Sequence, residues 1–367
     1  MEYSQLEQIV APLLAWYEAE HRQLPWRRTK DPYKVWVSEI MLQQTRVETV
    51  IPYFERFMER CPTVAALASC EDEALLKLWE GLGYYSRARN LKKAAQVICA
   101  SYDGKFPEAY EAIRALPGIG DYTAGAISSI ALEQARAAVD GNVLRVVTRL
   151  TQDSRDIMEN KFRRQVTEAL ENVYPSARRG DFTQSLMELG AVVCVPNGEP
   201  LCGRCPLKTL CGAEKQGTQM QYPVKKKKLE RKTEYKTVFI LINENKIALR
   251  KRGAQGILSG MWELPNIEGI QTASQIRQEL AEKNIALSEL REVSGGKTPL
   301  KHIFTHMEWH MTCWVAVCST VGTDDELTWV TEEQLTHEFA LPTAFKKCLK
   351  CCGRVWEGTG GQQQHDK

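Results

Sequence analysis

The hydrophobic pattern of this chain changes its period once, and that change constrains the fold more than any other feature. Residues 1 to about 215 carry apolar side chains at the three- and four-residue spacing of helices. Residues 216–234 are polar and basic and indicate a linker, either a solvated tether or a segment that runs close to phosphates. Beyond residue 234 the pattern favours strands. The sequence therefore predicts a helical domain joined to a domain that contains a sheet.

Three helices can be placed in the N-terminal half. One carries apolar residues from Val47 to Met58, with Pro52 as a kink or a boundary. A second apolar face runs from Leu75 to Leu82 and stops at neighbouring glycines, and a third runs from Leu91 to Ile98. Thr63 follows a proline and is expected to cap the helix after it.

The C-terminal half has the composition of an α+β domain. Residues 237–242 and 246–250 flank a short polar turn, which is typical of a β-hairpin. Residues 308–317 are rich in Trp, Val and Thr and predict another strand, whereas residues 275–283 and 332–337 predict helices. We therefore expect a sheet with a few helices packed on it.

Composition limits the class of protein. A chain of 367 residues is long enough for two domains, each with its own core. Its 43% hydrophobic and 26% charged residues are those of a soluble globular protein, and its start lacks the pattern of a signal peptide. We expect a cytoplasmic protein. The formal net charge of +2 neither requires nor excludes a nucleic-acid partner.

Four cysteines form a tight cluster. Cys194, Cys202, Cys205 and Cys211 are separated by seven, two and five residues. In an intracellular chain such a cluster indicates a metal site more than a disulfide framework, and the unequal spacing favours a [4Fe-4S] cluster over structural zinc. The alternative is four unligated thiols, which seldom crowd into a polar loop.

The segment from Leu116 to Ile127, LPGIGDYTAGAI, predicts a helix-hairpin-helix. Gly118 and Gly120 allow the backbone to approach a phosphate, and the amides at the start of the second helix can bind it. The alternative is an ordinary corner between two helices.

Two carboxyl groups are candidates for catalysis. Asp140 lies in AVDGNVLRV and Glu39 lies in VWVSEIMLQQT. Asp140 could instead cap a helix that starts near Asn142, and Glu39 could lie on a solvated helix face.

Taken together, these motifs resemble the MutY-type adenine DNA glycosylases, from about residue 5 to about residue 350. The similar segments are PWR at 25–27, SEIMLQQT at 38–45, GLGYYSRARN at 81–90, LPGIGDYTAGAI, VDGNVLRV and the four cysteines. The resemblance implies an all-α helix-hairpin-helix glycosylase domain over residues 1–215, with an iron–sulfur cluster loop at 194–211. After the linker it implies a MutT-like (Nudix) α+β domain over residues 235–352, and we expect a disordered tail over residues 353–367.

The resemblance also implies a reaction. The expected substrate is double-stranded DNA with adenine opposite 8-oxoguanine or guanine, bound by a monomer, and the expected cofactor is a [4Fe-4S] cluster. Excision requires the adenine to be flipped out of the helix. Two carboxyl groups in different environments suit cleavage of the N-glycosidic bond: Glu39 as general acid and Asp140 as the ionised group that stabilises the sugar cation.

Other site residues are carried over from the resemblance. Tyr122 and Asn142 would support the two carboxyls. The remaining positions would line the adenine pocket, wedge into the duplex or read the lesion: Arg22, Trp26, Arg27 and Gln184; Leu42, Gln44, Thr45 and Tyr84; Phe304, Thr305 and His306. Packing in the core is the alternative for Trp26, Leu42 and Tyr84, and a turn that leads into a strand is the alternative for residues 304–306.

Three rival functions are weighed against this one. A bifunctional lyase would need an amine near Tyr122, and DYTAG offers no lysine. A lesion-binding protein without activity would not need both carboxyls. A nucleotide pyrophosphatase would need an intact Nudix box, but the segment from Gln278 to Ile285 has lost metal-binding carboxylates.

The gap between the first two cysteines of the cluster, Cys194 and Cys202, is seven residues, one longer than the family's usual six. The histidines at 302, 306 and 310 and the cysteines at 348, 351 and 352 are not expected to bind metal.

Overall fold

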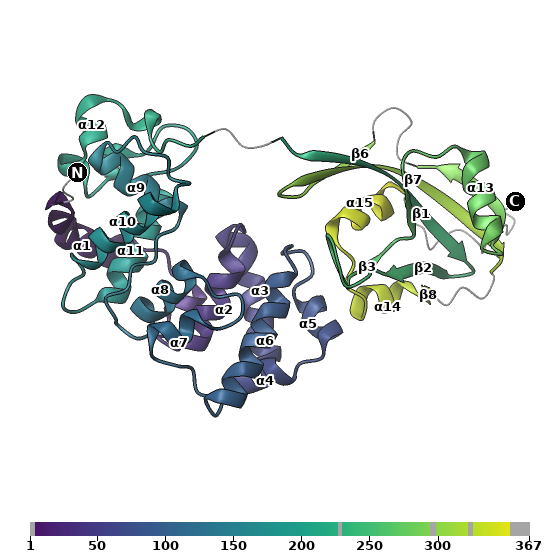
Figure 1. Cartoon of the computed structure of the whole chain (residues 1–367), viewed down its shortest axis with the longest axis horizontal. Coiled ribbons are helices and arrows are strands. Elements are labelled where there is room, and N and C mark those ends of the chain that lie inside the picture. The colour runs from purple at the N-terminus through teal and green to yellow at the C-terminus, as the bar shows by residue number, and fades with distance from the viewer. Residues whose placement is uncertain (1–3, 227–229, 294–298, 322–325, 353–367) are drawn as a thin grey trace, which may run out of the picture. The chain divides into compact units, whose positions relative to one another are not determined.

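The fold is known from a computed structural model, which describes residues 4–226, 230–293, 299–321 and 326–352. By their contacts the residues form two units, shown in Figure 1. One contains residues 1–70 and 89–228, and the other contains residues 71–88 and 229–367. The expected disordered tail at 353–367 lies outside the described residues. No helix in the described segments is long and apolar enough to cross a membrane.

The first unit is helical, as predicted. Its helices are α1 (Val10–Glu20), α2 (Pro32–Leu42), α3 (Val47–Arg60), α4 (Val64–Ser69), most of α6 (Ser86–Ser101), α7 (Tyr110–Arg114), α8 (Asp121–Ile130), α9 (Gly141–Thr151), α10 (Asn160–Glu171), α11 (Arg179–Val192) and α12 (Gly212–Gln216). The predicted helix around Pro52 is continuous, with the proline inside α3. Thr63 caps α4 as expected, because its hydroxyl accepts a hydrogen bond from the amide of Ala66.

One hydrophobic core of this unit lies next to the clustered cysteines. Buried apolar side chains of α9, α10 and α11 pack with Leu6, Ile9 and Leu13 at the N-terminus. Cys194, Cys205 and Cys211 lie against the same core. Helices α9 and α11 therefore support both the cysteine loop and the residues at the start of α9.

The helix-hairpin-helix prediction is confirmed. Helix α7 ends at Arg114, and α8 begins at Asp121 after a turn. Gly118 has a φ of 77°, in the left-handed region, and a Cβ atom there would lie only 2.6 Å from Cβ of Asn90. Glycine is required at this turn for both reasons. Gly120 precedes α8, whose N-terminus has no side-chain cap.

The second unit contains an eight-stranded sheet, which confirms the α+β prediction. Its strands are β1 (Lys232–Asn243), β2 (Lys246–Lys251), β3 (Trp262–Glu263), β4 (Asn266–Glu268), β5 (Ala286–Glu292), β6 (Leu300–Ile303), β7 (Met307–Thr320) and β8 (Leu327–Val330). The main order is β3-β2-β1-β7-β5, with β4 on β1, β6 on β7 and β8 on β2. Strands β1 and β7 are parallel, and the predicted hairpin of β1 and β2 is antiparallel.

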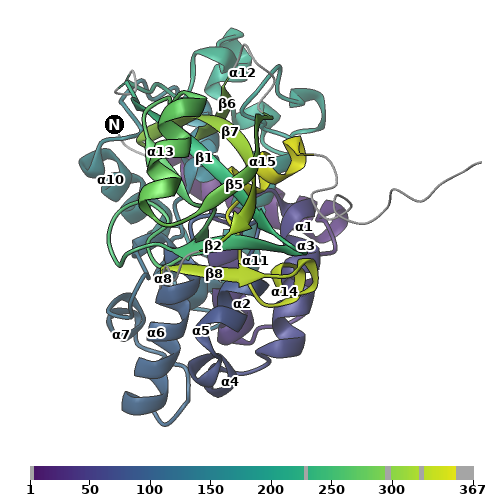
Figure 2. The ribbon, with the colours of Figure 1, turned by 90° about the vertical axis from the view of Figure 1, so that its right-hand side faces the viewer.

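Helices cover both faces of this sheet (Figure 2). Helix α13 (Ala273–Glu282) packs on one face, and α15 (Thr343–Cys351) packs on the other next to the short α14 (Glu332–His337). The unit also includes α5 (Asp72–Leu78). Lys77 of α5 donates hydrogen bonds to the carbonyls of Leu335 and Phe339, a link that the residue patterns do not indicate.

Candidate active site

The first unit contains a cavity of about 540 Å³ that brings together residues from five of its segments. Eleven of the predicted site residues line it: Arg22, Trp26, Arg27, Glu39, Leu42, Gln44, Thr45, Tyr122, Asp140, Asn142 and Gln184. This size is typical of small-molecule pockets. The other predicted residues, Gly118, Gly120, Tyr84 and residues 304–306, do not line it.

Glu39 lies in the wall of this cavity and is 6% exposed, so the alternative of a solvated helix face is wrong. It lies on α2, whose residues from Val35 to Met41 are all buried. The hydroxyl of Tyr122 donates a hydrogen bond to Oε2 of Glu39 over 2.5 Å. Burial raises the pKa of Glu39 to about 7, and the hydrogen bond from Tyr122 opposes the rise. A carboxyl group with this pKa can supply a proton near neutral pH.

Asp140 is held in a fixed orientation at the start of α9. Its Oδ1 accepts a hydrogen bond from the amide of Val143 over 2.8 Å, and its Oδ2 accepts one from the Asn142 side chain over 2.7 Å. It therefore caps the helix, as the alternative reading held, and it also faces the cavity. Burial raises the pKa of Asp140, whereas both hydrogen bonds favour its ionised form.

Asn142 is in turn held by an arginine. The guanidinium of Arg145 donates to Oδ1 of Asn142 and to the carbonyl of Gly190, each over 2.8 Å. It also donates to the carbonyl of Cys194 over 2.7 Å. Gly190 permits this close packing, because a Cβ atom there would lie 2.6 Å from Cβ of Asn142. Neither Arg145 nor Gly190 was indicated by a sequence motif.

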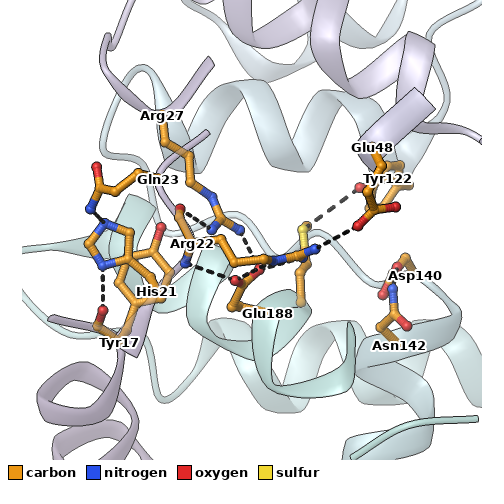
Figure 3. A network of polar contacts seen from close by, with 11 residues as sticks. Tyr17, His21, Arg22, Gln23, Arg27, Glu48, Tyr122, Asp140, Asn142 and Glu188 are labelled. Atoms are coloured by element: carbon orange, nitrogen blue, oxygen red, sulfur yellow. Dashed lines mark hydrogen bonds and ion pairs between the residues drawn. The ribbon is translucent and has the colours of Figure 1, made fainter. Parts of the chain in front are cut away.

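Glu188 is a third carboxyl group of the cavity, and no sequence motif indicated it. Its side chain is fully buried on α11, and it lines the cavity one helical turn after Gln184. Its oxygens accept hydrogen bonds from the backbone amide and the side chain of Arg22 and from the side chain of Arg27, as Figure 3 shows. Although burial opposes it, these bonds lower the pKa of Glu188 to about 2. An acidic residue in the otherwise apolar run LMELGAVV was the available signal.

Trp26 packs in the core and also lines the cavity. It is 6% exposed and packs edge-on against Phe54, with ring centroids 5.5 Å apart, yet it also lines the cavity. Leu42 is partly buried and lines the cavity as well. The wall thus combines a flat aromatic ring, apolar side chains, two fixed guanidinium groups and three carboxyls in different environments.

The four clustered cysteines lie in one loop, with none in a disulfide. Burial raises the pKa of Cys205 to about 12, and the charges of the other three cysteines add to the rise. A guanidinium nitrogen of Arg149 donates to Sγ of Cys194 over 3.3 Å. No three His, Cys, Asp or Glu side chains in the described segments are arranged as a metal site.

The predicted lesion-reading residues form a turn in the second unit. Phe304, Thr305 and His306 connect β6 to β7, so they form the turn before a strand that was considered as their alternative role. The ring of Phe304 packs against Trp309, and Thr305 is exposed. The hydroxyl of Thr305 lies 2.9 Å from that of Tyr84, which is 46% exposed, so the core alternative for Tyr84 is wrong.

Comparisons with known proteins identify the family of this chain. Residues 37–172 match the family model of the HhH-GPD superfamily base excision DNA repair proteins, and residues 237–351 match the NUDIX domain. Human adenine DNA glycosylase is 33% identical over 94% of this chain and 73% of its own length. The fission yeast (Schizosaccharomyces pombe) adenine DNA glycosylase is 30% identical over 91% of this chain and 88% of its own length.

Solved structures support the fold of the first unit. A thermostable thymine-DNA glycosylase matches 58% of this chain and 98% of its own, with 28% identity and a TM-score of 0.54. An endonuclease III in a DNA complex matches 60% of this chain and 99% of its own, with 22% identity and a TM-score of 0.50, which shows the fold alone. With its matched domains and its similarity to full-length relatives, the chain belongs to the adenine DNA glycosylases, which excise adenine from DNA in base excision repair.

Proposed function

We propose that Glu39 is the general acid of adenine excision and that Asp140 stabilises the sugar cation. The observation that carries this proposal is the contrast between two carboxyls in one cavity. Burial gives Glu39 a pKa of about 7, whereas two hydrogen bonds favour the charged form of Asp140. Pairs of carboxyls with such different environments divide the acid and the anionic roles in glycosidic bond cleavage.

The reaction starts with an adenine flipped from the duplex into the cavity. Glu39 donates its proton to the purine, which leaves as the N-glycosidic bond breaks. The negative charge of Asp140 offsets the positive charge that develops on the sugar. A water molecule then adds to that sugar, and its proton passes to the Glu39 carboxylate, which is thereby restored to its acid form. Trp26 and the arginines at 22 and 27 hold the base, because they line the cavity and Glu188 fixes both guanidinium groups.

We propose a monofunctional enzyme that cleaves the base but not the strand. A lyase needs a nucleophilic amine beside the sugar to form a Schiff base. Among the described residues that line the cavity, none is a lysine, and Tyr122 donates its hydrogen bond to Glu39. Breaks in the strand should therefore appear only after treatment with alkali.

The proposed cofactor is a [4Fe-4S] cluster held by Cys194, Cys202, Cys205 and Cys211. The donors suit it, because four soft thiols lie in one short loop, none is used in a disulfide, and Cys194, Cys205 and Cys211 pack against the same core. When bound, the cluster would fasten this loop. Arg145 ties the carbonyl of Cys194 to Asn142, so the loop supports the orientation of Asp140.

We further propose that residues 304–306 read 8-oxoguanine and that Gly118 and Gly120 let the hairpin approach a DNA phosphate. The exposed hydroxyl of Thr305 can bond to the edge of the damaged base, and Phe304 anchors the turn against Trp309. The uncapped start of α8 offers backbone amides to a phosphate.

We propose that the enzyme acts as a monomer in the cytoplasm.

The test is a single-turnover assay on duplexes with adenine opposite 8-oxoguanine or guanine, read with and without alkali. Glu39→Gln should bind the duplex as the parent does and excise adenine about 10²-fold to 10⁴-fold more slowly. Glu55→Gln, an exposed change on α3, is the matched control and should behave as the parent. A parental rate for Glu39→Gln would refute the assignment of the acid.

A further inference from the structure

Residues 71–88 belong to the C-terminal unit, although the residues on both sides of them belong to the helical unit. This segment contains α5, the two residues Trp79 and Glu80, and the run GLGYYSR, which carries Tyr84. Its contacts in the C-terminal unit are therefore with residues that lie far away in the sequence. A cluster of charged side chains makes those contacts, and the function proposed above uses none of them.

Glu80 is the centre of this cluster. Its side chain is 10% exposed, and its Oε1 accepts a hydrogen bond from the backbone amide of Leu341, just before α15, over 2.7 Å. The same oxygen lies 2.9 Å from the ammonium group of Lys346 on α15, and Oε2 lies 2.9 Å from that of Lys77. Hydrogen bonds to a charged group are stronger than neutral ones, and they are stronger still where little water competes. Three such donors hold this carboxylate in one position.

Lys77 completes the cluster from α5. Besides its ion pair with Glu80, it donates hydrogen bonds to the carbonyls of Leu335 and Phe339, over 2.9 and 3.1 Å. A lysine ammonium group has three N–H donors, and these three oxygens are enough to satisfy them. The contacts form a clasp, which consists of two side chains of the segment and their four partners: Lys77 and Glu80; Leu335, Phe339, Leu341 and Lys346.

A second attachment of α5 is more exposed. Glu73 accepts hydrogen bonds from the ammonium group of Lys251 over 2.7 Å and from the indole nitrogen of Trp262 over 3.0 Å. Its side chain is 42% exposed, and solvent-exposed ion pairs contribute little. The clasp at Glu80 is therefore the stronger of the two attachments.

The clasp lies directly before the turn that carries Tyr84. Trp79 is fully buried, and its indole nitrogen donates a hydrogen bond to the carbonyl of Gly83 over 3.1 Å. Tyr84 has a φ of 48°, which a residue other than glycine keeps only where its surroundings impose it. Its hydroxyl lies 2.9 Å from that of Thr305. A shift of Glu80 would reach Tyr84 through this short turn.

We propose that Glu80 is a positioning residue for lesion recognition, which holds Tyr84 beside Thr305 through the clasp. This inference rests on the proposed role of residues 304–306 as the reader of 8-oxoguanine. Tyr84 and Thr305 are 221 positions apart, so their hydroxyls meet only while the segment is fastened to the C-terminal unit. The clasp residues lie outside the lining of the adenine cavity, so its loss should affect recognition more than excision itself.

The experiment measures single-turnover excision of adenine opposite 8-oxoguanine and opposite guanine by the full chain. Glu80→Ala should lower the ratio of the two rates at least fivefold, while the rate opposite guanine stays within twofold of the parent. Glu333→Ala removes an exposed carboxylate of α14 outside the clasp and should keep the parental ratio. A loss of stability alone would lower both rates together and leave the ratio unchanged.

Hydrogen exchange in the absence of DNA is a second readout. Glu80→Ala should speed the exchange of backbone amides in residues 81–88 at least tenfold and leave that of α9 unchanged. Glu80→Gln keeps the size of the side chain and an oxygen for the amide of Leu341, so it covers the case in which Glu80→Ala does not fold. It should change the excision ratio and the exchange rates in the same direction.

Thr305→Val, measured in parallel, separates this inference from the one on which it rests. If Thr305→Val lowers the ratio and the Glu80 variants do not, residues 304–306 read the lesion without the clasp, and the role of Glu80 is overturned. If Thr305→Val keeps the parental ratio, the reader assigned above is wrong, and the role of Glu80 is overturned with it. Parental exchange of residues 81–88 in the Glu80 variants would also overturn that role.

Discussion

Replacing Glu188 by glutamine tests whether this buried carboxylate fixes the positions of Arg22 and Arg27 in the wall of the cavity. The substitution keeps the size of the side chain but removes its charge. It also turns one acceptor into an amide donor that faces the donors of Arg22 or Arg27. We expect the two guanidinium groups to lose their fixed positions and the excision rate to fall.

The magnitude follows from the pKa of Glu188. A fall from 4.5 to about 2 corresponds to roughly 3 kcal/mol at 1.36 kcal/mol per pH unit. The side chain of Arg22 is 32% exposed, so screening reduces this to about 2–3 kcal/mol. For a unit of this size, such a loss lowers the melting temperature by about 5–10 °C.

The pH dependence has a definite sign. Because folding lowers the pKa of this carboxyl, its contribution is complete above the unfolded value near 4.5 and disappears as the pH falls towards about 2. The difference in unfolding free energy between parent and Glu188→Gln should therefore be constant from pH 6 to 8 and shrink below pH 4.5.

Thermal unfolding and single-turnover excision are the two measurements. The control is Glu18→Gln, which removes an exposed ion pair with Arg178, also at the edge of α11. That variant should match the parent in both measurements, because exposed pairs contribute little. A parental melting temperature and excision rate for Glu188→Gln would refute the reasoning.

The other predictions concern groups that act through their neighbours. Tyr122→Phe removes the hydrogen bond that lowers the pKa of Glu39, so the pH above which single-turnover excision declines should move upward; an unchanged pH–rate profile would contradict this. Gly190→Ala places a methyl group against Asn142 and should slow excision about tenfold or more while duplex affinity, measured by gel shift, stays within a few-fold; a parental rate would show that the contact is not tight. Thr305→Val keeps the shape of the side chain but removes its hydroxyl, so the ratio of excision rates opposite 8-oxoguanine and guanine should fall about tenfold. An unaltered ratio would mean that this turn is not the lesion reader.

The catalytic motifs could be found in the sequence because their spacing is local. The turn after α7 needs glycine at 118 for its backbone angles, and Asp140 caps the helix that it starts. The change from helical to strand periodicity can likewise be recognised within short windows of neighbouring residues. The resemblance of these motifs to the MutY-type adenine DNA glycosylases is what assigned Glu39, Tyr122 and Asp140 to the candidate site.

Other features depended on contacts between distant residues. Arg22 and Glu188 are 166 positions apart, so no local pattern could indicate that one carboxylate holds two arginines of the cavity. The burial that raises the pKa of Glu39 likewise comes from the packing of several helices around it.

The same distinction applies to the C-terminal unit. Its strands could be predicted from their residue pattern, but the pairing of β1 with β7 could not, because parallel strands are joined through distant contacts. That sheet places Lys236 beside Trp309, with Arg252 of the neighbouring hairpin over the same ring. Sequence by itself determined which elements form and which motifs they carry. Tertiary structure decided which charges are buried together, because desolvation depends on everything that surrounds a group in space.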